Sequence, residues 1–564
     1  MTDPDFDAIV VGSGISGGWA AKELTQKGLR VLLLERGKPL PVGSGYLGEH
    51  APNWKLPFQG KRPRQLYQEE YPVQSKVYAF SEANRQFWNN DKENPYAAEE
   101  GKPFLWARSD VVGGRSLLWA RQTYRFSEQD FTANATDGHG IPWPVGYDHI
   151  APWYSYVEKF VGINGKKEGL PQLPDGEFQK PMPWFALEHT IHERLKKQAP
   201  DVTLTNGRCA VLTEDLPGRQ ACHYCGPCER GCSTGSYFSS QSSTLPAAAA
   251  TGRLTLRANA LVERLEYDKA SGRIARVHVI DTVSRERMAI SAKIFFLCAS
   301  TVGSTQILMN SASEAFPNGL ANSSGVLGRY MMDHTTGVSA IGIFLDNMDS
   351  YYHGNRPTGL YIPRFRNVGG QDEDADFVRG YGYQTATLRM DWQTGINARG
   401  FGAELKDKLR KPGPWIFALA GFTECLPRES NRMYLSTHKV DRYGIPQVVF
   451  DFQWSDNEIK LRRDARKHAE RLLKAAGAVF IVPEEDKMSL PGEGIHEMGT
   501  ARMGADPATS VLNARNQAHE VPNLFVTDGS FMTSASCVNP SLTYMAFTAR
   551  ACDYAVKQLA AGAL

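Results

Sequence analysis

A glycine-rich turn between two short apolar runs, close to the start of the chain, restricts the fold more than any other stretch. The runs cover residues 8–11 and 31–34, and the turn GSGISG between them spaces Gly12, Gly14 and Gly17 as G-x-G-x-x-G. The first glycine permits a tight turn, the second lets a pyrophosphate approach the backbone, and the third lets a helix pack closely on the strand. We therefore expect a strand, a helix and a parallel second strand that together bind a dinucleotide.

The residue that ends the second strand indicates which dinucleotide is bound. Glu35 stands there, where a carboxylate can accept hydrogen bonds from ribose hydroxyls and would repel a 2′-phosphate. This predicts FAD or NAD rather than NADP. The pyrophosphate would lie at the N-terminus of the first helix, where free N–H groups and the helix dipole favour anions. Arg36 follows directly and could reach a 2′-phosphate, so NADP stays open as an alternative at this point.

Length, charge and hydropathy bound the class of protein. The 564 residues exceed what one compact core usually holds, so a large domain with a second one is expected. A net charge of +2 gives no reason to expect a nucleic-acid partner. No apolar run reaches the roughly 18 residues of a membrane-spanning helix. The first residues lack the basic and apolar regions of a signal peptide, so none is expected.

A dense cysteine motif, ACHYCGPCERGCSTG, occupies residues 221–235. It carries Cys222, Cys225, Cys228 and Cys232, four of the nine cysteines of the chain. The spacing C-x2-C-x2-C-x3-C matches the run with which bacterial ferredoxins ligate an iron–sulfur cluster. Two alternatives remain: a zinc site, which normally pairs two hooks across a longer loop, and two local disulfides, which would constrain little of the chain.

Four motifs further along the chain share one family's features. They are WARSDVVGGRSLLWARQTYRF (106–126), LCASTVGSTQILMNS (297–311), GIHEMGTARMG (494–504) and NLFVTDGSFMTSASCVNP (523–540). Their content and order, together with the first turn, resemble the glucose–methanol–choline (GMC) flavin oxidoreductases over most of the chain.

The resemblance implies an α/β protein of the GMC fold. It would combine a Rossmann-like FAD-binding domain, a strand-rich α+β substrate domain and an inserted iron–sulfur loop. The FAD-binding domain would be discontinuous and take residues 1–50, 101–130, 240–334 and 490–564. Residues 51–100, 131–205 and 335–489 would form the substrate domain with a lid, and residues 206–239 the cysteine loop.

The same resemblance assigns the positions that would contact FAD. They are Gly12, Gly14 and Gly17 at the pyrophosphate, Glu35 at the ribose, Gly113, Gly114 and Ser116 near the flavin ring, the main chain of Val262 at the adenine, and Asp528 with Gly529 at the ribityl–pyrophosphate part. Some relatives join the flavin covalently to a histidine at the position where this chain has Leu118. We therefore expect non-covalent FAD.

Two residues match the catalytic positions of the family. His496, in HEMGT, matches the base, and an imidazole suits that task because its ordinary pKa of about 6.5 leaves it neutral near pH 7. Asn539, in NPSLT, matches a second position, where an amide can hold the substrate hydroxyl and steady a developing alkoxide. The alternative is that each caps a helix. His334, His189 and His192 fit no motif that needs an imidazole, so we expect structural roles for them.

The chain contains both CHYCGPCERGCSTGSYFS and HEMGTARMG. In this combination of motifs it resembles the flavoprotein subunits of bacterial glucoside 3-dehydrogenases. This implies oxidation of a sugar or glycoside hydroxyl, at C3 by preference, to a ketone. Iron–sulfur relatives in the family carry a three-iron cluster on three cysteines, with spacings that Cys222, Cys228 and Cys232 match. The additional Cys225 leaves a four-iron cluster open. A cluster would pass electrons singly to an acceptor, which favours a dehydrogenase. An oxidase that uses O2, with zinc-bound or structural cysteines, is the alternative.

The resemblance also implies partners and a compartment. Similar subunits travel with a small chaperone-like subunit that bears a twin-arginine signal, and a cytochrome accepts their electrons. We therefore expect a periplasmic enzyme, exported by its partner, with a cytoplasmic one as the alternative. Gln384, in YGYQTAT, could bind sugar hydroxyls, although a structural role is the simpler expectation.

Overall fold

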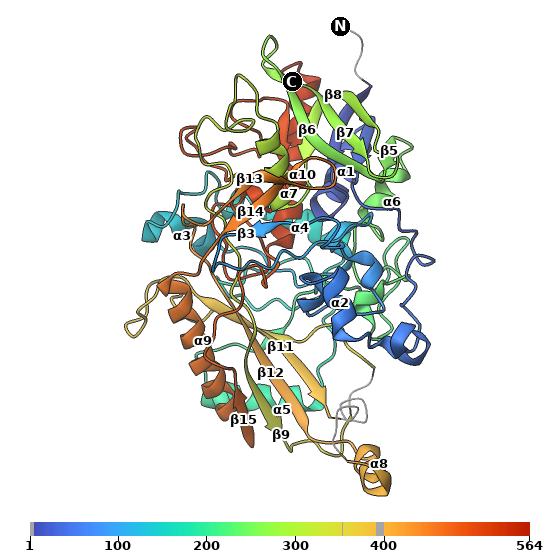
Figure 1. Ribbon diagram of the computed structural model, residues 1–564. Coiled ribbons are helices and arrows are strands. Elements are labelled where there is room, and N and C mark those ends of the chain that lie inside the picture. Colours follow the sequence, from blue (N-terminus) through green and yellow to red (C-terminus); the bar gives the residue numbers. More distant parts are fainter. Residues whose placement is uncertain (1–4, 352–353, 391–399) are drawn as a thin grey trace.

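Two large β-sheets form the framework of the fold, one above the other in Figure 1. The computed structural model describes residues 5–351, 354–390 and 400–564. The upper sheet has seven strands in the order β5-β2-β1-β8-β7-β6, and β16 pairs with β8. These strands are β1 (Phe6–Val11), β2 (Val31–Leu34), β5 (Leu254–Arg257), β6 (Ala260–Asp268), β7 (Arg273–Asp281), β8 (Arg287–Leu297) and β16 (Leu524–Val526).

The parallel part of this sheet explains where a ligand can bind. β1 pairs in parallel with β2 and β8, and β16 pairs in parallel with β8, whereas β7 pairs antiparallel with both β6 and β8. The strands are almost wholly apolar, as expected when both faces of a parallel sheet are covered. Their carboxyl ends meet at one edge, which is where open α/β sheets bind nucleotides.

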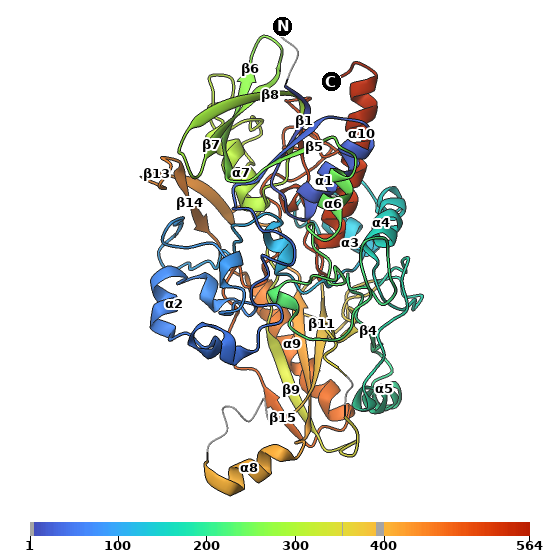
Figure 2. The same ribbon diagram turned by 90° about the vertical axis from the view of Figure 1, so that its right-hand side faces the viewer.

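Helices cover the upper sheet. α1 (Ile15–Gln26) packs between α6 (Thr244–Ala249) and α10 (Ser541–Ala560), and α10 also packs on α4 (Tyr147–Val161). Figure 2 shows α1 and α10 side by side near the C-terminus. The remaining helices on this side are α3 (Glu128–Asp137) and α7 (Thr301–Asn310).

The lower sheet is antiparallel and has the order β15-β9-β12-β11-β10-β4. Its strands are β4 (Thr205–Asn206), β9 (Val338–Phe344), β10 (Leu360–Ile362), β11 (Tyr381–Arg389), β12 (Trp415–Thr423) and β15 (Phe480–Pro483). Side chains alternate, so that Tyr383 and Phe417 join the core under α5 (Ala186–Gln198) and α9 (Asp456–Ala475). The opposite face carries Gln384 and Ala418, which line the cavity described below.

The rest of the chain forms small elements. β3 (Ala97–Ala98), β13 (Arg432–Val440) and β14 (Pro446–Asp451) make a three-stranded sheet, and the short helices α2 (Arg64–Glu70) and α8 (Gly402–Arg410) lie at the periphery. Within the described ranges, no helix combines the length and apolar character that crossing a bilayer requires. The predicted fold class, a Rossmann-like sheet joined to a strand-rich unit, is therefore confirmed.

Candidate active site

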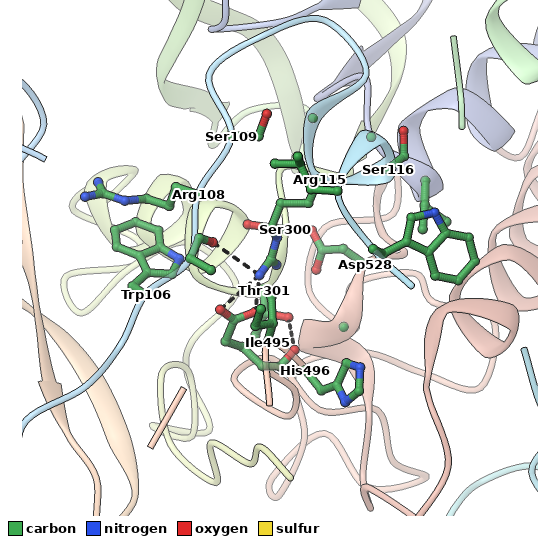
Figure 3. A pocket seen from close by; sticks show the side chains of 18 of the residues that line it. Trp106, Arg108, Ser109, Arg115, Ser116, Ser300, Thr301, Ile495, His496 and Asp528 are labelled. Carbon is green, nitrogen blue, oxygen red and sulfur yellow. Dashed lines mark hydrogen bonds and ion pairs between the residues drawn. The ribbon is translucent and has the colours of Figure 1, made fainter. Parts of the chain in front are cut away.

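A cavity of about 810 Å³ runs from the glycine turn to the lower sheet. One end is lined by the β1–α1 turn and Glu35, and the other by His496, Asn539 and the inner face of β11 and β12. Figure 3 shows this space from close by, with Ser116 and Asp528 on one side and His496 below. The predicted nucleotide and catalytic residues therefore share one continuous cavity.

The glycine turn is shaped by close backbone contacts. Gly12 has φ of +96°, which suits glycine, and a Cβ built on Gly17 would lie 1.7 Å from the carbonyl oxygen of Gly12. Helix α1 can therefore approach the strand only because residue 17 has no side chain. A Cβ on Gly14 would meet no atom within 4 Å, since this position opens into the cavity at the N-terminus of α1. The turn is thus a cradle for an anionic group.

Glu35 is buried at the end of β2, as the sequence predicts. One carboxylate oxygen accepts the backbone N–H of Ser13 at 2.9 Å, and the other accepts that of Gly37 at 2.7 Å. Burial raises the pKa of Glu35, although these hydrogen bonds oppose the shift. The guanidinium of Arg36 lies 3.2 Å from the Asp110 carboxylate. Arg36 is therefore engaged elsewhere, which disfavours the NADP alternative.

The middle of the cavity is lined by the other predicted contact positions. Gly114, Ser116, Val262, Asp528 and Gly529 all line it, and Gly113 adjoins them and donates its N–H to the Ser13 hydroxyl. Asp528 is held by Ser304 and Ser530, which donate hydrogen bonds to its carboxylate. Leu118 also lines the cavity. It stands at the position where some relatives join the flavin covalently to a histidine.

At the far end, His496 lies in a clamped loop. The carboxylate of Asp333, which is fully buried, accepts the backbone N–H groups of Gly492, Gly494 and His496 at 2.9, 3.1 and 3.0 Å. Ile495 has φ of +57°, a strained conformation for a β-branched residue. Burial and the nearby charge of Glu497 raise the pKa of Asp333 to about 7. The clamp holds the imidazole of His496 against the cavity.

Asn539 completes this end. Its Nδ2 lies 3.4 Å from Nε2 of His496, and its Oδ1 accepts a hydrogen bond of 2.6 Å from Nε2 of Gln384 on β11. Helix α10 begins at Ser541 and no side chain caps its start, so the capping alternative for Asn539 is wrong. The sequence-predicted pair is thus brought together by two segments that are distant along the chain.

Comparison with known proteins decides the family. The family profile described as GMC oxidoreductase matches residues 6–336 with its N-terminal part and residues 427–548 with its C-terminal part. The chain belongs to the GMC oxidoreductases. This GMC oxidoreductase acts with FAD on CH–OH groups of alcohol or sugar-type substrates.

Relatives support the assignment over the whole length. The chain is 30% identical to 2-methyl-1,2-propanediol dehydrogenase of Mycolicibacterium austroafricanum, across 97% of this chain and 94% of the relative. It is 26% identical to the fructose dehydrogenase large subunit of Gluconobacter japonicus, across 99% and 98%. The crystal structure of pyridoxine 4-oxidase from Mesorbium loti, 17% identical, covers 97% of this chain and 98% of its own with a TM-score of 0.58, which shows the shared fold.

The cavity fits FAD. Its length connects a phosphate cradle at Gly14 and a ribose acceptor at Glu35 to a catalytic end at His496, as a flavin dinucleotide requires. Gly14 leaves open space where the pyrophosphate would lie, and Glu35 keeps a buried carboxylate beside it. The positions predicted to contact FAD therefore line or adjoin one cavity that could hold it.

One neighbour of His496 was not predicted from the sequence. His334, fully buried, places its Nδ1 2.9 Å from Nδ1 of His496 and its Nε2 2.8 Å from the carbonyl oxygen of Ser536. The expectation of an ordinary structural histidine is not what the structure shows. Met332 pairs with Met498 in an antiparallel bridge, and this long-range pairing brings the two histidines together. No local pattern in the sequence signals it.

The four cysteines lie in one loop that packs on the cluster of Met182, Cys209, Val211 and Tyr237. Cys225 is exposed, Cys222, Cys228 and Cys232 are partly buried, and all are free thiols. Hence the two local disulfides are not formed. Four thiolates around zinc lie about 3.8 Å apart when Zn–S is about 2.3 Å. Across the described residues, no three cysteine sulfurs lie within 4.8 Å of one another, so a preformed zinc site is disfavoured.

Two buried arginines flank the cysteine loop. Arg121 is 2% exposed and stacks on Tyr237, 3.6 Å from the ring centre, while Arg219 is 6% exposed and its Nη2 has no hydrogen-bond partner. Both guanidinium groups donate hydrogen bonds to backbone carbonyl oxygens, and among the described residues neither forms an ion pair with a carboxylate. Burial lowers the pKa of Arg219 to about 10, and the thiol of Cys232 opposes this. Two such buried cations favour an anionic group at this loop.

Proposed function

We propose that this GMC oxidoreductase is a dehydrogenase that oxidises a secondary hydroxyl of a pyranose sugar or glycoside, preferably at C3, to a ketone. The observation that carries the proposal is the pairing of His496 with Asn539 where the cofactor cavity meets the lower sheet. We further propose that electrons leave through an iron–sulfur cluster on the cysteine loop. A sugar oxidase that uses O2, with structural cysteines, is the alternative that the experiment must exclude.

His496 has the environment that a general base needs. Burial lowers its pKa well below the ordinary 6.5, and His334 and Arg115 add to the shift, so the ring is neutral at pH 7. Nε2 would take the proton of the substrate hydroxyl. FAD, when bound, supplies the acceptor for the hydrogen that leaves the carbon with its electron pair. The amide Nδ2 of Asn539 would hold the same oxygen and stabilise the negative charge that develops on it.

The inner face of the lower sheet supports a ring-sized substrate. Ala386, Ala418 and Ala420 leave room beside the catalytic pair, and Phe422 offers an aromatic face of the kind on which sugar rings stack. Gln384 lines the same face and fixes the amide of Asn539. The choice of C3 rests on the resemblance to glucoside 3-dehydrogenases described above.

The cysteine loop supports an electron exit. Backbone N–H groups of Tyr224 and Tyr237 point at the sulfurs of Cys222 and Cys232 at 3.4 and 3.5 Å, which is a common arrangement around cluster ligands. Cys222, Cys228 and Cys232 would hold a three-iron cluster. Recruitment of the exposed Cys225 would convert the set to four ligands. The buried cations of Arg121 and Arg219 would offset the negative charge of either cluster.

A partner surface is proposed beside this loop. Leu47 and Trp54 are 75% and 72% exposed. They belong to a segment that packs on the cysteine loop, where Glu49 accepts the N–H of Ser233 at 2.6 Å. Large exposed apolar side chains of this kind mark interaction sites. We propose a small signal-bearing subunit and a cytochrome acceptor as partners, with the periplasm as the compartment and the cytoplasm as the alternative.

An assay with an artificial electron acceptor across a panel of glycosides tests the proposal. We expect dye reduction with pyranosides, a ketone at C3 by NMR, iron by elemental analysis, and little peroxide. His496→Ala should lower the rate of flavin reduction by about 10³-fold while FAD content stays unchanged. His278→Ala, on β7 and outside the cavity lining, is the matched control. Iron-free protein that produces peroxide rapidly would contradict the dehydrogenase assignment.

A further inference from the structure

Four side chains, His496 among them, form one continuous chain of hydrogen bonds. Gln384 contacts Asn539, Asn539 contacts His496, His496 contacts His334, and His334 contacts the backbone carbonyl of Ser536. Each imidazole in such a chain can donate from one nitrogen and accept at the other. The direction in which the hydrogen bonds run therefore decides which nitrogen of His496 carries the proton.

The Ser536 end of the chain fixes this direction. A carbonyl oxygen can only accept, so the contact of 2.8 Å requires that Nε2 of His334 carries a hydrogen. Burial lowers the pKa of His334 to about 4, so its ring holds a single proton at pH 7. Its Nδ1 is then an acceptor. The contact of 2.9 Å between the two Nδ1 atoms follows only if His496 is the donor, with its hydrogen on Nδ1.

The other end of the chain agrees with this tautomer. Nε2 of Gln384 donates a hydrogen bond of 2.6 Å to Oδ1 of Asn539. The amide nitrogen of Asn539 therefore faces Nε2 of His496, and it can only donate. Nε2 must then carry a lone pair. Both ends of the chain leave the free lone pair of His496 on the nitrogen that faces the cavity.

We propose that His334 is a positioning residue, which locks His496 in the Nδ1–H tautomer so that Nε2 is the base. The inference rests on the proposed function for the identity of the reaction and on hydrogen-bond geometry for the role of His334. The substrate O–H bond would break and its proton would move to Nε2 of His496. FAD, when bound, would supply the acceptor for the hydrogen that leaves the carbon with its bonding electron pair. The imidazolium keeps its Nδ1–H bonded to the neutral ring of His334, which shares the new positive charge.

Asp333 and His334 act together on the same loop. Asp333 holds the backbone of residues 492–496, and His334 holds the ring of His496 from the adjacent position. The arrangement resembles a catalytic triad in logic, because a third group orients the base through its second nitrogen. It differs because the orienting group here is a neutral imidazole rather than a carboxylate.

Two variants of His334 test the proposal. His334→Leu removes the acceptor, whereas His334→Asn keeps an amide oxygen close to the position of Nδ1. We expect the rate of anaerobic flavin reduction to fall about 10²-fold in His334→Leu and to recover at least tenfold in His334→Asn. FAD content and KM should stay near the wild-type values in both variants, because the side chain of residue 334 does not contact the glycine turn that would bind the cofactor.

A spectroscopic readout separates this proposal from the proposed function. Nitrogen-15 NMR of histidine-labelled holoenzyme, with His496→Gln to assign the signals, should show His496 as the Nδ1–H tautomer at pH 7, with or without a substrate. An Nε2–H tautomer in the wild type would overturn the proposal even if His334→Leu is too unstable to purify. So would equal rates for His334→Leu and wild type, or an Asn variant no faster than the Leu variant. If no glycoside is a substrate, the proposed function is refuted, whereas the inference about the tautomer of His496 still stands or falls on the NMR result.

Discussion

Two glycines of the nucleotide turn should separate protein stability from cofactor binding. In Gly17→Ala the new Cβ would lie 1.7 Å from the carbonyl oxygen and 2.7 Å from the carbonyl carbon of Gly12. Both are backbone atoms, so α1 must move away from β1 by more than about 1 Å to reach ordinary contact distance. Overpacking of this kind costs about 1–3 kcal/mol, and we expect the upper end of that range because the neighbour is rigid.

In Gly14→Ala the new Cβ meets no protein atom, and φ of −68° suits alanine. A smaller loss of backbone entropy on folding should roughly offset the weaker N-cap. The stability of the apoprotein should therefore change by less than about 1 kcal/mol. The methyl group would, however, occupy space beside the pyrophosphate. We expect FAD affinity to fall at least about tenfold, which corresponds to about 1.4 kcal/mol.

Thermal unfolding of each apoprotein, with and without FAD, measures both effects. Bound cofactor raises stability according to the ratio of its concentration to Kd, so a weaker site gives a smaller shift in Tm. Gly17→Ala should lower Tm without FAD by a few degrees. Gly14→Ala should leave that value unchanged and reduce the shift caused by FAD. Equal destabilisation of the two apoproteins, or full FAD affinity in Gly14→Ala by fluorescence titration, would refute this account of the turn.

Three further predictions concern the catalytic end and the cysteine loop. Gln384→Leu removes the donor to Asn539, so kcat should fall about tenfold at unchanged FAD content, measured by single-turnover reduction and flavin absorbance. The pKa of His334 is about 4 in the folded protein and about 6.5 in the unfolded chain, so the unfolded chain takes up a proton first as the pH falls. The stabilisation that the neutral ring provides is therefore fully present only above pH 6.5. That contribution falls by roughly 3 kcal/mol as pH drops to 4, so acid unfolding of His334→Asn should be less pH-dependent than that of wild type. Arg219→Met should make the midpoint potential of a bound cluster more negative by spectroelectrochemistry, because it removes a buried positive charge beside the cysteine loop.

The nucleotide half could be predicted from the sequence because its function depends on neighbours along the chain. Gly12, Gly14 and Gly17 belong to one turn, and Glu35 follows at the end of the next strand, so spacing alone encodes their geometry. Burial of Glu35 and the pairing of Arg36 with Asp110 were not encoded in that way. Arg36 pairs with Asp110, which lies 74 positions further along the chain, so only the structure shows that its guanidinium is engaged away from a 2′-phosphate.

The catalytic end was only partly predictable, because its contacts cross long stretches of sequence. His496 and Asn539 came from their match to family motifs, and the structure places them 3.4 Å apart. His334 and Gln384 have no such motif. A buried histidine in MMDH and a strand glutamine in YGYQTAT look structural until the pairing of Met332 with Met498 and the register of β11 bring them to the base.

The cysteine loop shows how charge adds to what spacing predicts. Spacing indicates a cluster but does not say how the loop communicates with the flavin site. Ala120 and Gln122 line the cofactor cavity, whereas the guanidinium of Arg121 between them lies under Tyr237 beside the cysteines. A buried cation here would stabilise an electron that arrives at the cluster, because reduction adds negative charge. The Arg121 guanidinium donates hydrogen bonds to the backbone carbonyl oxygens of Leu117, Trp119 and Phe238, and one short segment would thus link both sites of the proposed electron path.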